Sequence, residues 1–305
     1  MKSFDTEQKE YIDKFFSKSF SKCNISFEIF PPADCEIESK FWNFIKILIK
    51  FRPKFISITY RNTSNSYNKT YSIVKKIQKY TNIELAPHIT CINVKSNELY
   101  NLAKKYWKNG IKHVIALRGD IININKNINS LIYASDLVYF LKQIANFNIT
   151  VAAYPEIHPE SKNAKEDLIN LKRKIDAGAT RAITQFFFNI ETYLIFRDKC
   201  ISQGINIEII PGILPINNFI QLKKMIKITN IKIPNFINKM FQSLNKQDEK
   251  ICKLLGSFIA IEMIRKLKKE GVNHFHFYTL NKSEIIYAIC LYLGIKPNEN
   301  VFNKT

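Results

Sequence analysis

Polar side chains recur where apolar, strand-like segments of this 305-residue chain come to an end. The first is Glu28, which lies among apolar residues just before Pro31 and Pro32. Six later segments end in the same way, at Thr59, His88, Asp120, Tyr154, Gln185 and Tyr278. One such residue is no more than an ordinary polar turn, and Glu28 alone could lie in water at a sheet edge. Together they indicate one pocket for a small molecule, lined by carboxyl, imidazole, hydroxyl and amide groups.

Glu28 would be costly to bury without a partner or a task. Successive side chains of a strand point to opposite faces, so Ile25, Phe27 and Ile29 would share one face and Glu28 the other. A glutamate in water has a pKa of about 4.3. Burial, with Asp120 as a like-charged neighbour, favours the neutral carboxyl group, which can donate a proton near neutral pH.

The spacing of apolar residues predicts eight strands, each followed by a helix. The strands are expected at residues 24–30, 55–60, 83–90, 112–117, 150–154, 181–185, 206–213 and 275–278. Regular alternation predicts a parallel sheet, and eight units in 305 residues predict an α/β fold of one domain, a (β/α)8 TIM barrel. An open doubly wound sheet is the alternative. It would normally carry a Gly-rich first turn, and the chain has only eight glycines and no G-x-G-x-x-G or P-loop motif.

The chain divides into a helical lead-in at 1–21, a catalytic barrel at 22–297 and a short tail at 298–305. Two extra helices, at 234–241 and 248–270, would be inserted before the eighth strand. Active sites of such barrels lie at the carboxyl ends of the strands. The barrel would therefore gather the polar residues that end the strands into one site.

Composition excludes several classes of protein. The net charge of +20 comes from lysines spread over the whole chain, together with many Asn and Ile, and no nucleic-acid-binding motif accompanies it. No apolar run reaches the roughly 18 residues of a membrane span. The N-terminus lacks the order of a signal peptide, and the six cysteines form no C-x-x-C pair, so we expect reduced thiols and a cytoplasmic protein. His274 and His276 lie two apart on one strand face, but they lack the spacing of a metal site, and we expect no metal. His276 is better explained as a hydrogen-bonded interior residue.

Seven segments resemble, in the same order along the chain, those of bacterial 5,10-methylenetetrahydrofolate reductase. They are SFEIFPP at 26–32, APHITC at 86–91, ALRGD at 116–120, YPEIHPE at 154–160, TQFFF at 184–188, IPGILP at 210–215 and FHFYTLN at 275–281. The resemblance implies a barrel with non-covalently bound FAD, which uses NADH to reduce methylenetetrahydrofolate to 5-methyltetrahydrofolate by ping-pong hydride transfer through the flavin. It also implies a homotetramer that supplies methyl groups for methionine biosynthesis.

The resemblance also implies a role for each matching residue. Glu28 would be the acid that protonates the folate, and Asp120, the second catalytic residue, would lie near both the flavin and the pterin. Thr59 would help to hold NADH, and the folate would contact Asp120, Gln185, Gln221 and Lys282, with Gln185 also touching the nicotinamide. The FAD would be held by Tyr60, His88, Arg118, Gly119, Asp120, Tyr133, Ala134, Tyr154, His158, Asp167, Asn170, Arg173 and Lys174. A solvated helix face is the alternative explanation for the last four of these, which lie on one side of a predicted helix.

The chain departs from the family pattern at three places. Arg61 and Asn62 replace small residues, Met225 stands near the place of an aromatic residue that stacks on the substrate, and Lys282 replaces an arginine. Lysine keeps the charge but lacks the forked donor of arginine. Two other functions stay open as alternatives: a different FAD barrel, similar to proline dehydrogenase, and a basic RNA-associated barrel that has lost catalysis. The first would not need an acid at Glu28, and the second would not need to keep the pocket residues.

Overall fold

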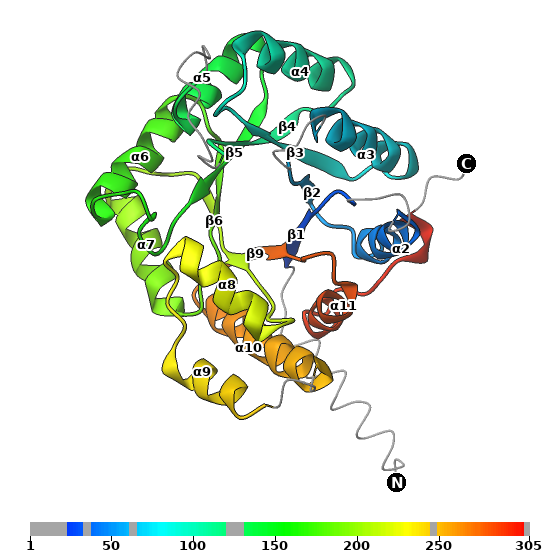
Figure 1. Cartoon of the computed structure of the whole chain (residues 1–305), viewed down its shortest axis with the longest axis vertical. Helices are drawn as coiled ribbons and strands as arrows, with labels where there is room; N and C mark the ends of the chain where they lie inside the picture. Colours follow the sequence, from blue (N-terminus) through cyan, green and yellow to red (C-terminus); the bar gives the residue numbers. More distant parts are fainter. Residues whose placement is uncertain (1–22, 33–37, 61–65, 120–130, 245–248, 302–305) are drawn as a thin grey trace.

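The protein consists of parallel strands joined by helices (Figure 1). The computed structural model describes residues 23–32, 38–60, 66–119, 131–244 and 249–301. The described strands are β1 (Asn24–Ile29), β2 (Phe55–Ile58), β3 (Glu84–Thr90), β4 (His113–Leu117), β5 (Asn148–Ala153), β6 (Arg181–Thr184), β7 (Glu208–Ile210), β8 (Gly212–Ile213) and β9 (His274–Tyr278). They pair in the order β7-β6-β5-β4-β3-β2-β1-β9-β8, and neighbours run parallel. The (β/α)8 barrel predicted from the sequence is confirmed.

The barrel closes at a seam between β7 and β8. One strand was expected over 206–213, but Pro211 divides it, because proline has no N–H to give to the ladder. The first half pairs with β6 and the second half with β9. Pro211 O accepts a hydrogen bond of 3.0 Å from His276 N, which joins the dividing residue to β9. The two short strands thus occupy the place of the single predicted seventh strand.

Helices form a ring around the strands (Figure 1). They are α2 (Glu38–Ile49), α3 (Ser66–Tyr80), α4 (Ser96–Lys108), α5 (Ala134–Ile144), α6 (Ala164–Asp176), α7 (Ile190–Ser202), α8 (Phe219–Thr229), α9 (Asn235–Gln242), α10 (Glu249–Lys269) and α11 (Ser283–Tyr292), followed by the 3-10 turn η2 (Glu299–Val301). The predicted insertion before the last strand corresponds to α9 and α10. The expected lead-in at 1–21 lies outside the described residues.

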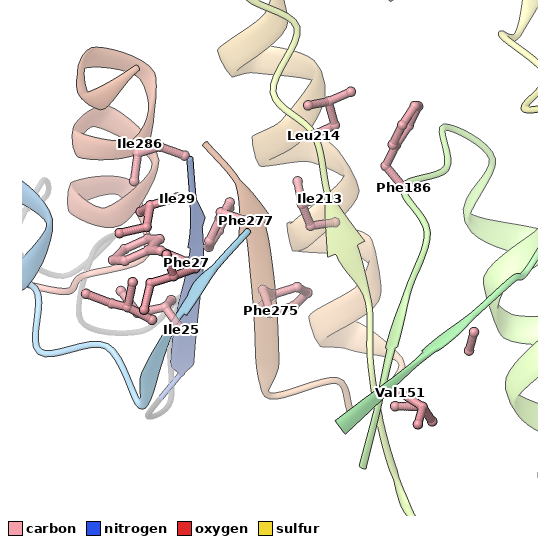
Figure 2. Close-up of a cluster of buried hydrophobic side chains, with 14 of the residues drawn as sticks. Ile25, Phe27, Ile29, Val151, Phe186, Ile213, Leu214, Phe275, Phe277 and Ile286 are labelled. Atoms are coloured by element: carbon pink, nitrogen blue, oxygen red, sulfur yellow. The ribbon is translucent and has the colours of Figure 1, made fainter. Parts of the chain in front are cut away.

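The outer and inner faces of the strands build two different cores. Ile25, Phe27 and Ile29 of β1 point outward and are at most 2% exposed, and Figure 2 shows them beside Ile286 of α11. A small apolar cluster of residues from five strands fills the barrel interior: Phe55, Ala86, Ile115, Ile183 and Ile210. The predicted alternation along β1 is therefore confirmed, and it turns Glu28 to the inner face.

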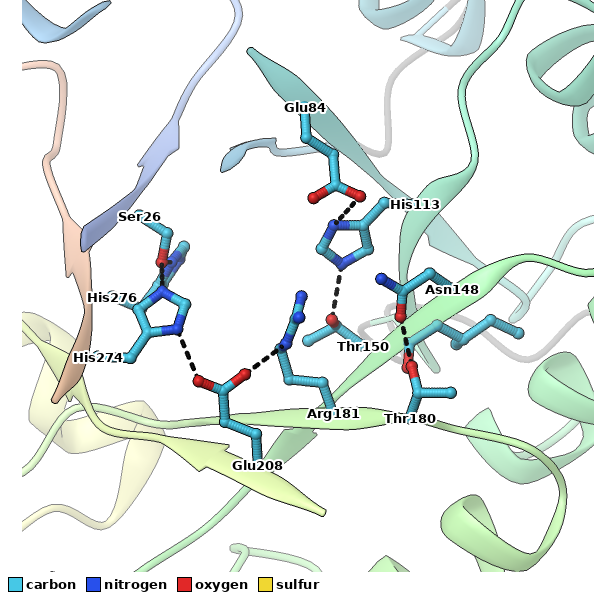
Figure 3. Close-up of polar contacts among 11 residues, drawn as sticks. Ser26, Glu84, His113, Asn148, Thr150, Thr180, Arg181, Glu208, His274 and His276 are labelled. Atoms are coloured by element: carbon cyan, nitrogen blue, oxygen red, sulfur yellow. Dashed lines mark hydrogen bonds and ion pairs between the residues drawn. The ribbon is translucent and has the colours of Figure 1, made fainter. Parts of the chain in front are cut away.

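A polar network occupies the inside of the barrel near the first residues of several strands (Figure 3). Glu208 accepts from His274 Nδ1 (2.8 Å) and from Arg181 Nε (2.9 Å). Ser26 Oγ lies 2.8 Å from His276 Nδ1 and 3.2 Å from His274 Nε2. His274 and His276 are thus both held by hydrogen bonds, which confirms the prediction made for His276. The end of the barrel opposite the predicted site is filled and charged.

Within the described residues, no helix is long and apolar enough to cross a bilayer. In the same part of the chain, no group of three or more His, Cys, Asp or Glu side chains could hold a metal ion. The five described cysteines are free thiols, and burial raises the pKa of Cys91 to about 12. Such a thiol stays protonated and unreactive at neutral pH.

Glu208→Gln should lower the stability of the protein by roughly 1 kcal/mol at pH 7, because the bonds of an ionised carboxylate are lost and Glu208 is partly exposed. The hydrogen bond from His274 lowers the pKa of Glu208. A lowered carboxyl pKa stabilises the fold at every pH above the unfolded-state pKa of about 4.3. This stability is lost as the pH falls through the lower pKa of the folded state. The unfolding temperatures of the parent protein and Glu208→Gln should therefore differ at pH 7 and approach each other below pH 4.3. Glu270→Gln, an exposed control, should change neither curve, and an equal loss at both pH values would refute the network's role.

Candidate active site

Glu28, Thr59 and His88 lie together at the carboxyl ends of neighbouring strands. Glu28 Oε2 is 3.7 Å from His88 Nε2, and the two side chains are only 13% and 9% exposed. Thr59 follows β2, the strand between β1 and β3, and its N–H donates to Ile29 O (3.0 Å). Thr59 Oγ1 and His88 Nε2 are buried and have no hydrogen-bond partner in the described part of the chain. Buried polar atoms rarely stay unpaired, so the cluster retains hydrogen-bonding capacity that a ligand can use.

Burial sets the charge of this cluster. It raises the pKa of Glu28 to about 8 and lowers the pKa of His88 to about 3. At neutral pH the two groups are therefore a carboxylic acid and a neutral imidazole rather than an ion pair. A carboxyl group that is still protonated at pH 7 can act as a general acid, and perturbed groups of this kind are typical of active sites.

The loop after β9 fixes the backbone on both sides of Glu28. Thr279 Oγ1 donates to Glu28 O (2.6 Å). The Asn281 side chain bonds Phe30 twice: its Oδ1 accepts from Phe30 N (2.9 Å) and its Nδ2 donates to Phe30 O (2.7 Å). Leu280 and Asn281 adopt left-handed backbone angles, with φ of 48° and 55°. Such strained conformations persist only where the surroundings hold them, so the position of Glu28 is fixed by its neighbours.

A second group of predicted residues meets at the ends of β4 and β5. Arg118 forms a bidentate pair with Glu160, with contacts of 2.6 and 2.5 Å. The ring of Tyr154 stands perpendicular to that of His158, with centroids 4.5 Å apart. His158 N donates to Asp167 Oδ2 (3.0 Å), which joins this loop to α6. These predicted FAD contacts therefore share one region, although the Arg118 guanidinium already has a carboxylate partner.

The other predicted residues of α6 differ in their surroundings. Lys174 Nζ donates to Ala152 O (2.6 Å), and burial lowers the pKa of this lysine to about 8. Arg173 is exposed, and its Nη1 donates to Asn170 Oδ1 (3.0 Å). Lys174 therefore has a structural contact with β5, whereas Asn170 and Arg173 form a polar surface pair, consistent with either explanation of this helix face.

Gly119 allows the chain to turn tightly after β4. Its φ is +91°, and a Cβ at this position would come 3.0 Å from Ile92 Cγ2. Glycine is the residue that adopts such an angle without strain, and the bare backbone lets another group approach closely. Asp120, expected to take part in catalysis and in binding both flavin and folate, lies outside the described residues, as do Arg61 and Asn62.

Three further predicted FAD contacts lie near the starts of helices. The ring of Tyr60 stacks on that of Tyr67, with centroids 4.3 Å apart. Tyr133 is 61% exposed and precedes Ala134, the first residue of α5. Tyr133 N donates to Asp136 Oδ2 (2.9 Å), which secures the start of the helix. An exposed aromatic ring at this place can still cover a bound ligand.

The predicted folate contacts lie at the end of β6 and at two helix starts. Gln185 follows β6, and its Oε1 accepts from Phe186 N (3.0 Å). Gln221 is exposed in the first turn of α8 and lines a narrow hollow with the half-buried Met225. Lys282 is exposed and directly precedes α11. Each has a side chain at or near the surface of the same barrel end, where a ligand can reach it.

Sequence reasoning missed Glu160, Thr279 and Asn281. All three lie within segments that were singled out, YPEIHPE and FHFYTLN. A short polar residue in a turn is most often a local capping group, and no spacing rule indicates that its partner lies on a distant strand. Only the contacts reveal that Asn281 holds Phe30 and that Glu160 pairs with Arg118.

Comparison with known proteins agrees with this geometry. The model of the methylenetetrahydrofolate reductase family matches residues 15–294. The chain belongs to this family. It is 49% identical to the 5,10-methylenetetrahydrofolate reductase of Salmonella typhimurium over 97% of this chain and 99% of that one. It is 52% identical to the enzyme of the same name from Buchnera aphidicola of Schizaphis graminum, over 94% and 97% of the two chains.

A solved structure from Clostridium thermocellum has the same fold, with a TM-score of 0.66 at 17% identity over 93% of this chain and 98% of that one. It is described as a protein that binds two copies of 5-methyl-5,6,7,8-tetrahydrofolic acid. At this level of identity the likeness concerns the barrel alone. Family membership, by contrast, makes the chain an enzyme that reduces methylenetetrahydrofolate.

Asn281→Ala should reduce the rate of methylenetetrahydrofolate reduction about tenfold or more, because Glu28 would lose the clamp that holds it in position. The same change leaves Phe30 N and Phe30 O without partners and should cost about 1–3 kcal/mol of stability. Steady-state kinetics and thermal unfolding measure the two effects. Asn235→Ala, an exposed control, should be neutral in both, and full activity in Asn281→Ala would show that the clamp does not govern Glu28.

Proposed function

We propose that this enzyme carries FAD and uses NADH to reduce 5,10-methylenetetrahydrofolate to 5-methyltetrahydrofolate. The observation that carries the proposal is the neutral carboxyl group of Glu28 at the end of β1. Burial raises the pKa of this group to about 8. The product would supply methyl groups for methionine biosynthesis. We also propose that the enzyme works in the cytoplasm as a homotetramer and has no nucleic-acid or membrane partner.

The described residues fit a bound FAD. Thr59 Oγ1 and His88 Nε2 are buried atoms without partners among the described residues, and they can bond a polar ring or a nicotinamide. Gly119 would contribute its backbone to the same site, and a Cβ there would crowd the side chains of Ile92 and Thr90. Arg118 can neutralise a pyrophosphate by exchanging Glu160 for it, since the planar guanidinium binds either anion through two donors. Tyr60, Tyr133, Ala134, Tyr154, His158, Asp167, Asn170, Arg173 and Lys174 would complete the FAD site.

Bound FAD would accept hydride from NADH and pass it to the folate. The chain's own task is to control a proton. The methylene carbon of the substrate is held between two nitrogens, and one C–N bond must open before hydride can complete a methyl group. Opening requires a proton on the departing nitrogen. Glu28, protonated near neutral pH, can donate it, and the neutral His88 beside it adds no charge that would expel the proton.

The remaining polar residues would hold the folate. Gln185 offers an amide to the pterin and to the nicotinamide, and Asp120 a carboxylate to the pterin and the flavin. Gln221 and Lys282 would bind the distant half of the substrate, where Lys282 can attract the terminal carboxylate as a point charge. Met225 can pack against the substrate as an adaptable apolar side chain.

The purified protein should be yellow, and anaerobic NADH should bleach its flavin absorbance near the wavelengths of oxidised FAD. Methylenetetrahydrofolate, added next, should restore the colour, with one equivalent of product for each flavin. The two steps test the ping-pong route directly. A colourless protein that FAD cannot reconstitute would refute the flavin proposal, and bleaching of the flavin by proline rather than by NADH would favour the other FAD barrel.

Glu28→Gln should still bind FAD and be reduced by NADH, but its folate step should slow by a factor of about 10²–10⁴, the usual contribution of a general acid.

In the parent enzyme the rate of the folate step should fall about tenfold per pH unit above pH 8, because deprotonation of Glu28 removes the proton donor. The NADH step needs no acid and serves as the internal control. Stopped-flow traces over a range of pH measure both, and a parent-like folate step in Glu28→Gln would exclude Glu28 as the acid.

A further inference from the structure

Tyr278, the last residue of β9, reaches across the inside of the barrel. Its hydroxyl donates to Thr184 O at the end of β6, at a distance of 2.7 Å. The ring packs against the apolar cluster that fills the barrel interior, and it lies edge-on to Phe186, with centroids 6.4 Å apart. The two halves of the divided seventh strand lie between β9 and β6. Tyr278 therefore bridges the seam with a side chain at a place where Pro211 interrupts the backbone ladder.

Gly212, the first residue of β8, makes this bridge possible. A Cβ at Gly212 would come 2.5 Å from Tyr278 Cε2 and would overlap Thr184 O. Gly212 N donates to Thr184 Oγ1 (2.9 Å), so the same threonine binds both neighbours. Tyr278, Thr184 and Gly212 form one contact set from three strands, which we call the seam clasp. No side chain other than hydrogen fits at Gly212 while the clasp is closed.

The two ends of the clasp adjoin the groups that the reaction requires. Tyr278 is the register partner of Glu28 on β1, and the next residue, Thr279, donates to Glu28 O. Thr184 directly precedes Gln185, whose N–H donates to Ala153 O (2.7 Å). A change in the clasp would therefore alter the separation between the acid of β1 and the amide of β6.

We propose that Tyr278 is a positioning residue, which fixes Glu28 and Gln185 at opposite sides of one folate by its bond across the seam to Thr184. The inference builds on the proposed function, since it assigns the two sides of the clasp to the same substrate. Burial raises the pKa of Tyr278 far above 10, so the hydroxyl stays protonated and donates at every working pH. The bond is thus a permanent spacer rather than a pH switch.

Tyr278→Phe tests the proposal, because it keeps the ring and removes only the hydroxyl. We expect the flavin content to stay near the parent value, while the folate step slows by about 10- to 100-fold, as misplacement of reacting groups does. The NADH step should slow by less, because Gln185 would touch the nicotinamide but Glu28 takes no part in that step. Binding of 5-methyltetrahydrofolate should weaken as well. The fall of the folate step above pH 8 should remain, since Glu28 is still the acid.

Tyr193→Phe is the matched control. Tyr193 is a buried tyrosine of α7, and its hydroxyl donates to a strand carbonyl, Ile209 O (2.9 Å), from the outer face of the barrel. Tyr193→Phe should lose about as much stability as Tyr278→Phe, but the rates of both half-reactions should stay unchanged. A folate step that is unimpaired in Tyr278→Phe, or equally impaired in both variants, would overturn the positioning role.

Two further results keep the inference separate from the proposed function. If the parent enzyme were not reoxidised by methylenetetrahydrofolate, the proposed function would fail before Tyr278 was tested. If Tyr278→Phe did not fold, Gly212→Ala would replace it, since a Cβ at this position would overlap both Thr184 O and the Tyr278 ring and so separate the hydroxyl from its acceptor. The same selective loss of the folate step is expected there, and a parent-like step would overturn the inference.

Discussion

Desolvation of Glu28 is the constraint on which the rest of the site depends. A carboxyl group on the inner face of a barrel strand cannot keep its hydration, and its pKa rises to about 8 because the charged form is the one that loses water. His88 lies within 3.7 Å but stays neutral for the same reason, so it does not turn the acid into a carboxylate. The surroundings thus favour a proton donor at a pH where free glutamate has none.

Polar side chains inside the barrel are paired differently at its two ends. Near the strand starts, Glu208, Arg181 and His274 bond one another, and this paired network favours a fixed, closed end. Near the strand ends, Thr59 Oγ1 and His88 Nε2 have no partner in the described part of the chain. The bonds among side chains stabilise the fold at the first end, although Arg181 Nη1 has no partner among the described residues there either. At the second end the unpaired atoms lie beside a protonated Glu28, and this combination favours a ligand.

Side-chain contacts to the backbone set the geometry of the site. Asn281 holds Phe30 from the loop after β9, and Tyr278 holds Thr184 across the seam. Both act where the regular ladder ends or is interrupted, since β1 stops before Phe30 and Pro211 divides the seventh strand. Strand pairing alone places the groups within one barrel mouth. These extra bonds restrict how far Glu28 can move within it.

The barrel, the inserted helices and the inward direction of Glu28 can be predicted from the sequence, because alternation and helical periodicity depend on neighbours along the chain. The sequence also located the strand-end residues, since each follows an apolar segment. It did not determine the break at Pro211, the Arg118–Glu160 pair or the hold of Asn281 on Phe30. These depend on which distant strands become neighbours. The apolar neighbours and Asp120 predict a neutral Glu28, but the separate effect of burial is visible only in the folded barrel. Burial within the closed barrel alone raises the pKa, and a hydrogen bond or an ion partner would have lowered it.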